Sequence, residues 1–301
     1  MPRLFSYPAH KSASILIVCL WTLVILSILG MGLTGLVLQE IKFASSYLRM
    51  TCSLPVARAA LRLVFYERPK DTTPTYDTMQ ELTQGNDVVL CEGTSYKYCF
   101  ADKKDGADTD GVIDEGALVN LNTATVDILK RLPGIDSDLA DKLANSGLRP
   151  YRSVNEVFLA EGMTAERFKL FKDYVTIYGV GKININTASK PVLIALGLDE
   201  ELADIILRFR KEHKIEEPPD SPVTAAGYGF SSVAKILEDL RSFASLGLRQ
   251  EEDLLAAFPL LDVKSEYLRF NVIPKVIGRE GIRYSVTIHP ATKKILSWAE
   301  Y

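Results

Sequence analysis

The sequence predicts an α+β fold with a long N-terminal helix, a helical middle region and a C-terminal antiparallel sheet. Three observations lead to this prediction: a long uncharged apolar run near the N-terminus, a pentapeptide that occurs twice in the middle of the chain, and alternating apolar residues near its C-terminal end. A change of hydrophobic period along a chain of 301 residues indicates separate helical and sheet regions.

The apolar run covers residues 14–38 and contains no charged side chain. About 20 apolar residues span a bilayer, whereas a buried core helix rarely needs a run of this length. Arg3 and Lys11 precede the run, and positive flanks tend to stay in the cytoplasm. The run is too long for the core of a cleaved signal peptide. We therefore expect a single-pass membrane anchor with a cytoplasmic N-terminus and the rest of the chain on the far side, which in a Gram-negative bacterium means an inner-membrane anchor and a periplasmic C-terminal domain.

The helical pattern continues beyond this run, from Glu40 to Tyr66. Pro55 interrupts the pattern and is expected to kink or break the helix. Apolar residues recur there at three- and four-residue intervals, the spacing of one helical face: Phe43, Tyr47, Met50, Leu54, Ala57, Leu61, Val64 and Phe65.

The segment after the helix, residues 67–85, is rich in Pro, Thr and Asp and is expected to be a linker. Val88–Phe100 alternates like a β-hairpin. Cys91 and Cys99 flank its polar middle, and in an oxidising compartment they are either a disulfide or two free thiols.

An acidic, Gly-punctuated loop at residues 101–116 carries the only dense carboxylate cluster of the sequence. Flexible acidic loops supply the oxygen ligands that Ca²⁺ prefers. The pattern does not match an EF-hand, so a Ca²⁺ site of another type and a solvated acidic surface are both open. The candidate ligands are Asp105, Asp108, Asp110, Asp114 and Glu115.

The pentapeptide Asn120–Ala124 (NLNTA) recurs at Asn184–Ala188 (NINTA). Each copy opens a short amphipathic stretch that runs into a Gly-containing turn, which indicates two helix-hairpin-helix-like repeats. The Asn and Thr side chains are expected to cap helix starts.

DNA-binding modules of this type carry a second glycine in the turn, so that backbone N–H groups can approach a phosphate. Here Asp136 and Asp199 occupy that position, where each can cap the following helix and would repel a phosphate. Residues 120–180 contain eight Lys/Arg and eight Asp/Glu, and the net charge is −3, so the sequence lacks a basic footprint. Nucleic-acid binding is not expected.

The C-terminal region changes to a period of two. Leu268, Phe270 and Val272 alternate, as do the apolar residues from Ile282 to Ile288, and residues 294–299 suit a third strand. This meander is expected to pack against the N-terminal helix. The three histidines are scattered and no nucleophile–base motif occurs, so enzyme activity is not expected.

Taken together, these features resemble the minor pseudopilin K family of type II secretion systems over nearly the whole chain. Residues 11–14 (KSAS) look like a prepilin-peptidase site, with cleavage between Ala13 and Ser14. The family's peptidase usually cuts after Gly, where this chain has Ala13. The aliphatic run ending at Trp21 and the repeated Asn-x-Asn-Thr-Ala signature are also similar to the family.

The resemblance implies a pilin-like fold, with the helical repeats inserted between sheet elements, and a non-enzymatic role at the tip of the pseudopilus. The fifth residue after the expected cut is Val18, where ordinary pilins carry a Glu that pairs with a neighbour's N-terminus; a tip subunit has no such neighbour. The implied partners are other minor pseudopilins, the major pseudopilin and the prepilin peptidase, and Ca²⁺ is an implied ligand.

The implied division of the chain is a leader (1–13), a membrane and extended helix (14–66), a linker, hairpin and acidic loop (67–117), two helical repeats (118–180 and 181–258) and a C-terminal meander (259–301). The main alternative is a membrane-anchored helix-hairpin-helix DNA receptor of the competence type, which the same Asn-x-Asn-Thr-Ala signature also fits.

Overall fold

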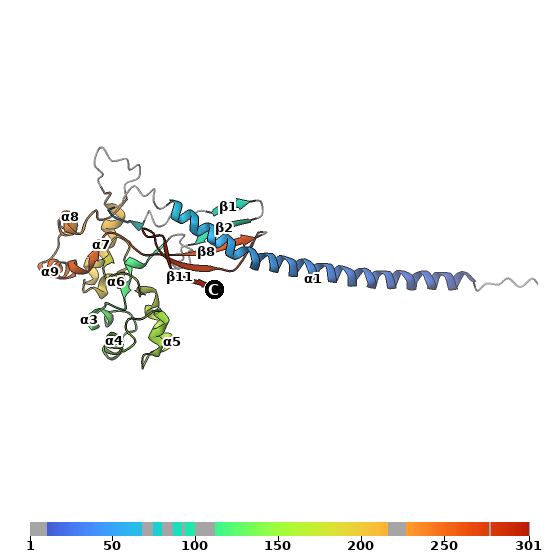
Figure 1. Ribbon diagram of the computed structural model, residues 1–301, viewed down its shortest axis with the longest axis horizontal. Coiled ribbons are helices and arrows are strands. Elements are labelled where there is room, and N and C mark those ends of the chain that lie inside the picture. Colours follow the sequence, from blue (N-terminus) through green and yellow to red (C-terminus); the bar gives the residue numbers. More distant parts are fainter. Residues whose placement is uncertain are drawn as a thin grey trace, which may run out of the picture.

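A computed structural model describes residues 11–67, 75–79, 87–91, 94–99, 112–215, 227–276 and 278–300. The chain forms an α+β molecule with three parts in line (Figure 1). Helix α1 (Lys11–Glu67) extends far from the rest, a sheet packs beside its C-terminal end, and a helical region lies at the opposite end of the sheet. The α+β architecture predicted from the sequence is confirmed.

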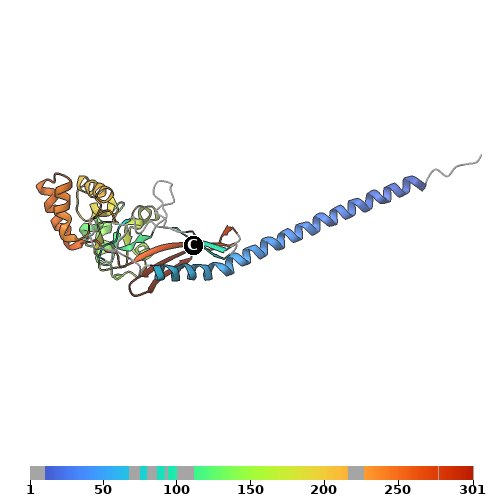
Figure 2. The ribbon, with the colours of Figure 1, turned by 90° about the horizontal axis from the view of Figure 1, so that it is seen from above.

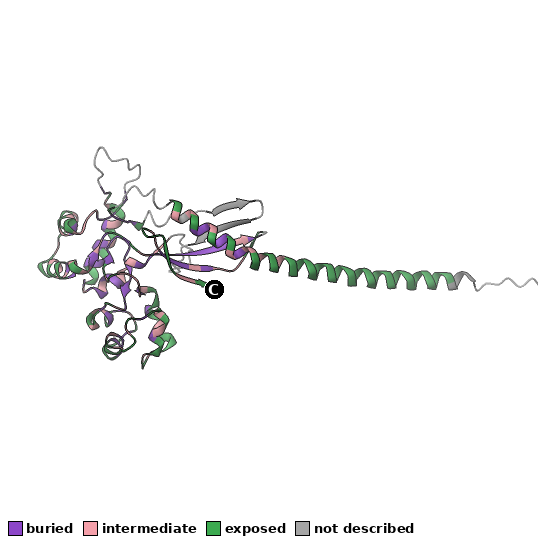
Figure 3. Ribbon diagram, in the orientation of Figure 1, coloured by how far each residue is buried: buried purple, intermediate pink, exposed green. Residues whose placement is uncertain are grey.

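Helix α1 is a single helix of 57 residues, continuous through Pro55. Of the kink or break expected at Pro55, the break is wrong because the helix is continuous, and Figure 2 shows that α1 changes direction where it leaves the sheet. Residues 15–44 of α1 are exposed to solvent with respect to the described part of the chain (Figure 3). Among the described residues, α1 is the one helix long and apolar enough to cross a membrane.

The main sheet is antiparallel, with the strand order β1-β2-β8-β10-β11. Two short strands, β3 and β9, also pair with β8. The bounds are β1 Asp87–Cys91, β2 Thr94–Cys99, β3 Ile113–Asp114, β8 Leu268–Val276, β9 Arg279–Glu280, β10 Tyr284–His289 and β11 Lys294–Glu300. The expected C-terminal meander is therefore confirmed as β8, β10 and β11, and β8 is the central strand of the whole sheet, with β2 on one side and β10 on the other.

The last turns of α1 cover one face of this sheet. Small residues of the helix, Ala57 and Ala60, let the backbone approach the inward-facing side chains of Phe270 and Val286 closely, and all four are fully buried. The remaining buried members of this core are Val56, Leu61, Leu268, Val272, Tyr284 and Ile288. The predicted packing of the meander on the N-terminal helix is confirmed.

The contact begins later along α1 than the apolar stripe does. Phe43, Tyr47 and Met50 belong to the predicted stripe, yet they are 75%, 63% and 64% exposed. Helical periodicity identifies an apolar face, but the chain itself covers that face only from about Ser53 onward.

The helical region contains two similar units, each closed by a short parallel strand pair. In the first, β4 (Val119–Asn120) pairs with β5 (Val175–Thr176); in the second, β6 (Ile183–Asn184) pairs with β7 (Leu261–Asp262). The helices of the first unit are α3 Val126–Leu129, α4 Ser137–Ala144 and α5 Ala165–Phe171; those of the second are α6 Lys190–Ala195, α7 Glu200–Glu212, α8 Ile236–Phe243 and α9 Leu248–Ala257. Short 3₁₀ turns occur at 115–117, 154–159, 172–174, 233–235 and 258–260.

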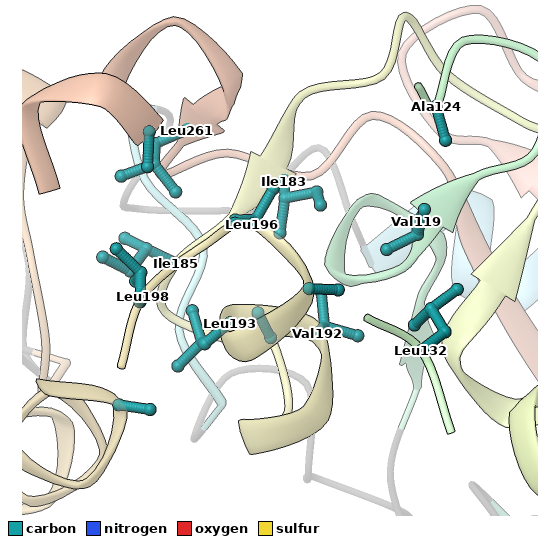
Figure 4. Packing of buried hydrophobic residues seen from close by; sticks show 14 of the residues in the cluster. Val119, Ala124, Leu132, Ile183, Ile185, Val192, Leu193, Leu196, Leu198 and Leu261 are labelled. Atoms are coloured by element: carbon teal, nitrogen blue, oxygen red, sulfur yellow. The ribbon is translucent and has the colours of Figure 1, made fainter. Parts of the chain in front are cut away.

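Both units share one apolar core, which is separate from the core under α1. Leu132 and Val119 of the first unit face Val192 and Ile183 of the second across their boundary (Figure 4). Between the two cores, where the sheet meets the helical region, lie buried polar side chains, among them Asp114, Asn184 and Ser265. These side chains are part of the candidate site.

Replacing Phe270 by Ala should destabilise the protein by about 3–5 kcal/mol, because a fully buried ring leaves a cavity under α1. Phe43→Ala is the matched control: its ring is exposed, so we expect a change within about 0.5 kcal/mol. Urea unfolding of the full chain in detergent, followed by tryptophan fluorescence, measures both. Equal losses in the two variants would contradict the packing described here.

Candidate functional site

The second Asn of each pentapeptide occupies an equivalent place in the two units. Asn122 accepts from the Tyr151 backbone N–H at 2.6 Å and donates to the Tyr151 carbonyl at 3.1 Å. Asn186 makes the same pair of bonds with Phe230, at 2.8 and 2.9 Å. Each amide thus satisfies both backbone groups of one residue in a distant loop and holds that loop against the signature.

An arginine supports each signature from another side. Arg210 donates to the carbonyls of Ile185 and Ala188 at 2.8 Å each. Arg149 donates to the carbonyl of Ala124 at 3.0 Å. Burial lowers the pKa of Arg210 to about 10, which leaves it charged at neutral pH. Neither arginine has a motif in the sequence, so only the structure reveals these roles.

The signature side chains therefore hold loops instead of capping helices. Helix α3 is capped by Thr125, which follows the pentapeptide, through the N–H of Ile128 at 3.4 Å. Helix α6 has no side-chain cap at Ser189. The expectation that Asn and Thr of the signature cap helix starts is wrong. The first Asn of each copy accepts from the N–H two residues further on, inside the signature itself, and the amide N–H groups of the Asn side chains donate to residues distant in sequence.

The two turn aspartates do cap helices. Asp136 accepts from the Leu139 N–H at 2.9 Å, and Asp199 accepts from the Leu202 N–H at 2.6 Å, as the sequence predicts. A glycine with a positive φ lies two residues before each aspartate: φ is 79° at Gly134 and 103° at Gly197. The hydrogen bond from the Leu139 N–H and, to a smaller extent, the one from the Arg167 side chain hold the pKa of the Asp136 carboxyl below its usual value. The N–H group that would face a phosphate is therefore already bonded to a carboxylate.

The first Asn of the pentapeptide distinguishes the two units. Asn120 donates to the carbonyls of Tyr178 and Gly179 within its own unit, at 2.9 and 2.7 Å. Asn184 instead donates to the Asp114 carboxylate at 3.1 Å and to Ser265 Oγ at 2.8 Å. The second signature therefore reaches the segment that joins the helical region to the sheet.

Asp114 and Glu115 are buried at this junction and do not belong to a solvated loop, because β3 joins the sheet at Asp114. Glu115 accepts from Thr176 Oγ1 at 2.5 Å, and its Oε1 lies 2.9 Å from Arg269 Nε, an ion pair without hydrogen-bond geometry. Burial raises the pKa of Asp114 from 3.8 to about 6; hydrogen bonds from Ser265 and Thr187 oppose the rise and Asp77 adds to it.

The proposed Ca²⁺ ligands are thereby divided. Asp105, Asp108 and Asp110 lie outside the described residues. Asp114 accepts from the Gly116 N–H at 2.7 Å and from three side chains, so protein donors already occupy its oxygens. Within the described part of the chain, no group of three or more His, Cys, Asp or Glu side chains could hold a metal ion. Asp114 and Glu115 therefore do not fit a Ca²⁺ site.

Cys91 is the last residue of β1, and Cys99 is the last residue of β2. Cys91 pairs with Thr94, so Cys99 lies five positions further along β2. At about 3.3 Å per residue, this register separates the two Cα atoms by roughly 17 Å, whereas a disulfide needs about 4.4–6.8 Å. The register does not favour a bond between them. Cys19 and Cys52 are free thiols.

Ala13 and Ser14, the expected processing site, lie in the first turns of α1, whose side chains at 11–14 are outside the described part. Beyond the apolar run, Phe43, Tyr47 and Met50 form an exposed stripe between the run and the sheet, which we call the collar. Large apolar patches of this kind mark surfaces that are covered in an assembly.

The fold is similar to that of a solved structure. A chain in "The Crystal Structure of the GspK-GspI-GspJ complex from enterotoxigenic Escherichia coli Type 2 Secretion System" aligns with a TM-score of 0.55 and 15% sequence identity, covering 83% of this chain and 96% of that chain. No protein-family model and no curated protein matches the sequence. This chain has a pilin-like fold.

Asn186→Ala should destabilise the protein by roughly 2–4 kcal/mol, because it leaves the buried N–H and carbonyl of Phe230 without partners. Asn155→Ala is the control, since Asn155 is exposed, and a change within about 0.5 kcal/mol is expected. Equilibrium unfolding of both variants decides the matter: a near-neutral Asn186→Ala would show that this amide does not hold the loop.

Proposed function

We propose that this protein is a minor pseudopilin at the tip of a type II secretion pseudopilus, where it initiates or caps assembly for the export of folded proteins. The observation that carries the proposal is the combination of a pilin-like fold with an exposed apolar α1. The sheet covers the C-terminal end of this helix, and no described residue outside α1 buries the helix from Ile15 to Ala44. The similarity to a chain of a pseudopilin complex supports the same conclusion.

Two environments would cover α1 in this role. Residues 14–38 would lie in the inner membrane, with the N-terminus cytoplasmic and the sheet and helical region periplasmic. The collar lies beyond that span, so lipid does not account for it. Burying one such apolar side chain contributes about 1.5–3 kcal/mol, and α1 of a neighbouring pilin-like subunit offers the complementary surface.

Two features favour the tip position. Val18 would be the fifth residue after the cut at Ala13, and it offers no charge to the amine of a neighbour above. The helical region adds bulk at the end of the sheet furthest from the start of α1 (Figure 1), a shape that suits the outside of a filament better than its interior. The proposed partners are other minor pseudopilins, the major pseudopilin and, for processing, the prepilin peptidase.

The competence-type DNA receptor is less well supported. Asp136 and Asp199 use their carboxylates to cap the helices that would have to receive a phosphate. Phosphate binding weakens steeply with salt and requires concentrated positive charge, whereas lysines 130, 142 and 190 are paired with carboxylates. We therefore also propose that the protein has no enzymatic or nucleic-acid-binding activity.

Calcium binding is proposed for the three acidic-loop residues that remain candidates, Asp105, Asp108 and Asp110. A ligand bound only to the folded state stabilises it by about 2.7 kcal/mol at 100 times its Kd. EDTA should therefore lower the melting temperature of the full chain in detergent, and Asp108→Asn with Asp110→Asn should abolish this effect. Asp127→Asn, on the exposed surface, is the control. An unchanged melting temperature in EDTA would leave the loop as solvated surface.

The intact mass of the protein purified from host membranes tests prepilin-type processing. We expect loss of residues 1–13 and a methylated Ser14. Ala13→Gly should be processed at least as completely, since it restores the usual residue, while a bulky Ala13→Phe should block cleavage. A full-length, unmodified chain in a strain with an active peptidase would contradict the proposal.

A further inference from the structure

The part of α1 that lies beyond the apolar run is basic. Residues 41–66 contain no acidic side chain and four basic ones: Lys42, Arg49, Arg58 and Arg62. Arg49 donates to the Ser45 carbonyl and to Ser46 Oγ of its own helix, at 3.4 and 2.9 Å. Arg58 and Arg62 are exposed, and neither forms an ion pair or a hydrogen bond with a described residue. We call these two residues the arginine pair.

The helix itself does not account for the arginine pair. Arg58 and Arg62 are four residues apart, a spacing at which like charges face one another on a helix and repel. The positions three and four residues away from either arginine are otherwise uncharged: Leu54, Pro55, Ala59, Leu61, Phe65 and Tyr66. A cation is stabilised by the helix dipole within the last turn, and the last turn of α1 contains no basic residue. Within the described part of the chain, the repulsion is therefore not compensated.

The arginine pair continues the collar along one face of α1. Tyr47, Thr51, Arg58 and Arg62 are exposed and follow one another at intervals of four, seven and four residues, the spacing of a single helical face. At about 1.5 Å per residue, Arg58 lies roughly 16 Å from Tyr47 along the axis, and Arg62 about 6 Å further. A helix that covers Tyr47 and runs alongside α1 therefore meets the arginine pair next.

Lipid headgroups do not reach the arginine pair if residues 14–38 span the membrane. Arg58 lies 20 residues beyond Leu38, which is about 30 Å along the helix. The headgroup layer adds only about 5–8 Å to each side of the hydrocarbon core, and salt screens charges over about 8 Å. Lys42, about 6 Å past the run, lies within this layer. The arginine pair needs a protein partner.

We propose that the arginine pair binds two carboxylates on the N-terminal helix of the neighbouring pilin-like subunit that covers the collar. This inference rests on the proposed function, which places such a helix there. A neighbour anchored in the same membrane with the same orientation runs parallel to α1. Without acidic residues at this height, it would desolvate two guanidinium groups that have no compensating charge, which is costly. Guanidinium and carboxylate groups match in geometry and form two parallel hydrogen bonds.

The spacing on α1 defines what the partner must carry. Arg58 and Arg62 are one helical turn apart, so the two carboxylates are expected three or four residues apart on the partner helix. They should lie about 11 residues after the apolar side chain that packs on Tyr47, because Arg58 follows Tyr47 by 11 residues. Apolar packing on the collar tolerates sliding, whereas paired charges fix the register and exclude wrong partners. The arginine pair thus selects which subunit lies beside this one, and at which height.

Carbodiimide coupling tests whether carboxylates face the pair. Arg58→Lys with Arg62→Lys keeps both charges and supplies amines that a carbodiimide joins directly to adjacent carboxylates. In membranes of a strain with active type II secretion, we expect amide bonds from these two positions to acidic residues of another pilin-like subunit, located by mass spectrometry of the crosslinked peptides. Arg152→Lys with Arg249→Lys is the matched control, since both arginines are exposed on the helical region, and it should give no bond to that subunit.

Charge reversal tests whether the pair selects the partner. Arg58→Glu with Arg62→Glu should lower the crosslinking yield from a photoreactive phenylalanine analogue at Phe43 to the same subunit about tenfold, because attraction becomes repulsion. The melting temperature of the full chain in detergent should stay the same, since the described part of the chain offers neither arginine a partner. Arg152→Glu with Arg249→Glu changes the net charge equally and should leave the yield unchanged. If the reversed chain does not fold, the coupling experiment alone decides.

The outcomes separate this inference from the proposed function. Suppose that the analogue at Phe43 reaches a pilin-like subunit in the otherwise unchanged chain. Coupling from positions 58 and 62 only within this chain, or to no protein, then overturns the role of the arginine pair and leaves the proposed function intact. An undiminished yield after charge reversal in a folded chain does the same. If the analogue at Phe43 reaches no pilin-like subunit, both proposals are overturned.

Discussion

The structure depends on how the last turns of α1 pack against the sheet. Ala57 and Ala60 bring the helix close to Phe270 and Val286, and this contact fixes the only part of α1 that the chain itself covers. A helix of 57 residues anchored at one end must find other partners for the rest. The exposed run and the collar are thus a consequence of where the sheet ends, and the proposed contacts with lipid and with similar helices would cover them.

The helical region is attached to this frame by polar contacts. Its apolar core is closed on itself, and Figure 4 shows that side chains of both units contribute to it. Toward the sheet, the link is made by Asp114, Asn184 and Ser265, whose hydrogen bonds are directional. Apolar packing gives each part its stability, while this network sets their mutual arrangement. The two copies of the signature differ in this respect. Asn184 donates to Asp114 and Ser265 at the link to the sheet, whereas Asn120 makes its bonds inside its own unit.

Much of the fold could be predicted from local patterns. The alternation around Phe270, the helical period of α1 and the capping aspartates Asp136 and Asp199 all depend on neighbours in sequence. The junction could not be predicted, because Asp114 reads as one more residue of an acidic loop until β3 pairs with β8. Periodicity likewise marks Phe43 as part of an apolar face without showing that the described part of the chain leaves this side chain exposed. Arg210 and Ser265 give no sequence signal, since their partners are backbone groups or distant side chains.

The most direct test of the central claim is site-specific photocrosslinking in a strain with active type II secretion. A photoreactive phenylalanine analogue at Phe43, in the collar, should crosslink this chain to another pilin-like subunit. The same analogue at Leu248, equally exposed but on the helical region, should give no such product. Crosslinks from Phe43 to lipid alone, or to no protein, would contradict the account, because the collar would then have no helix to cover it.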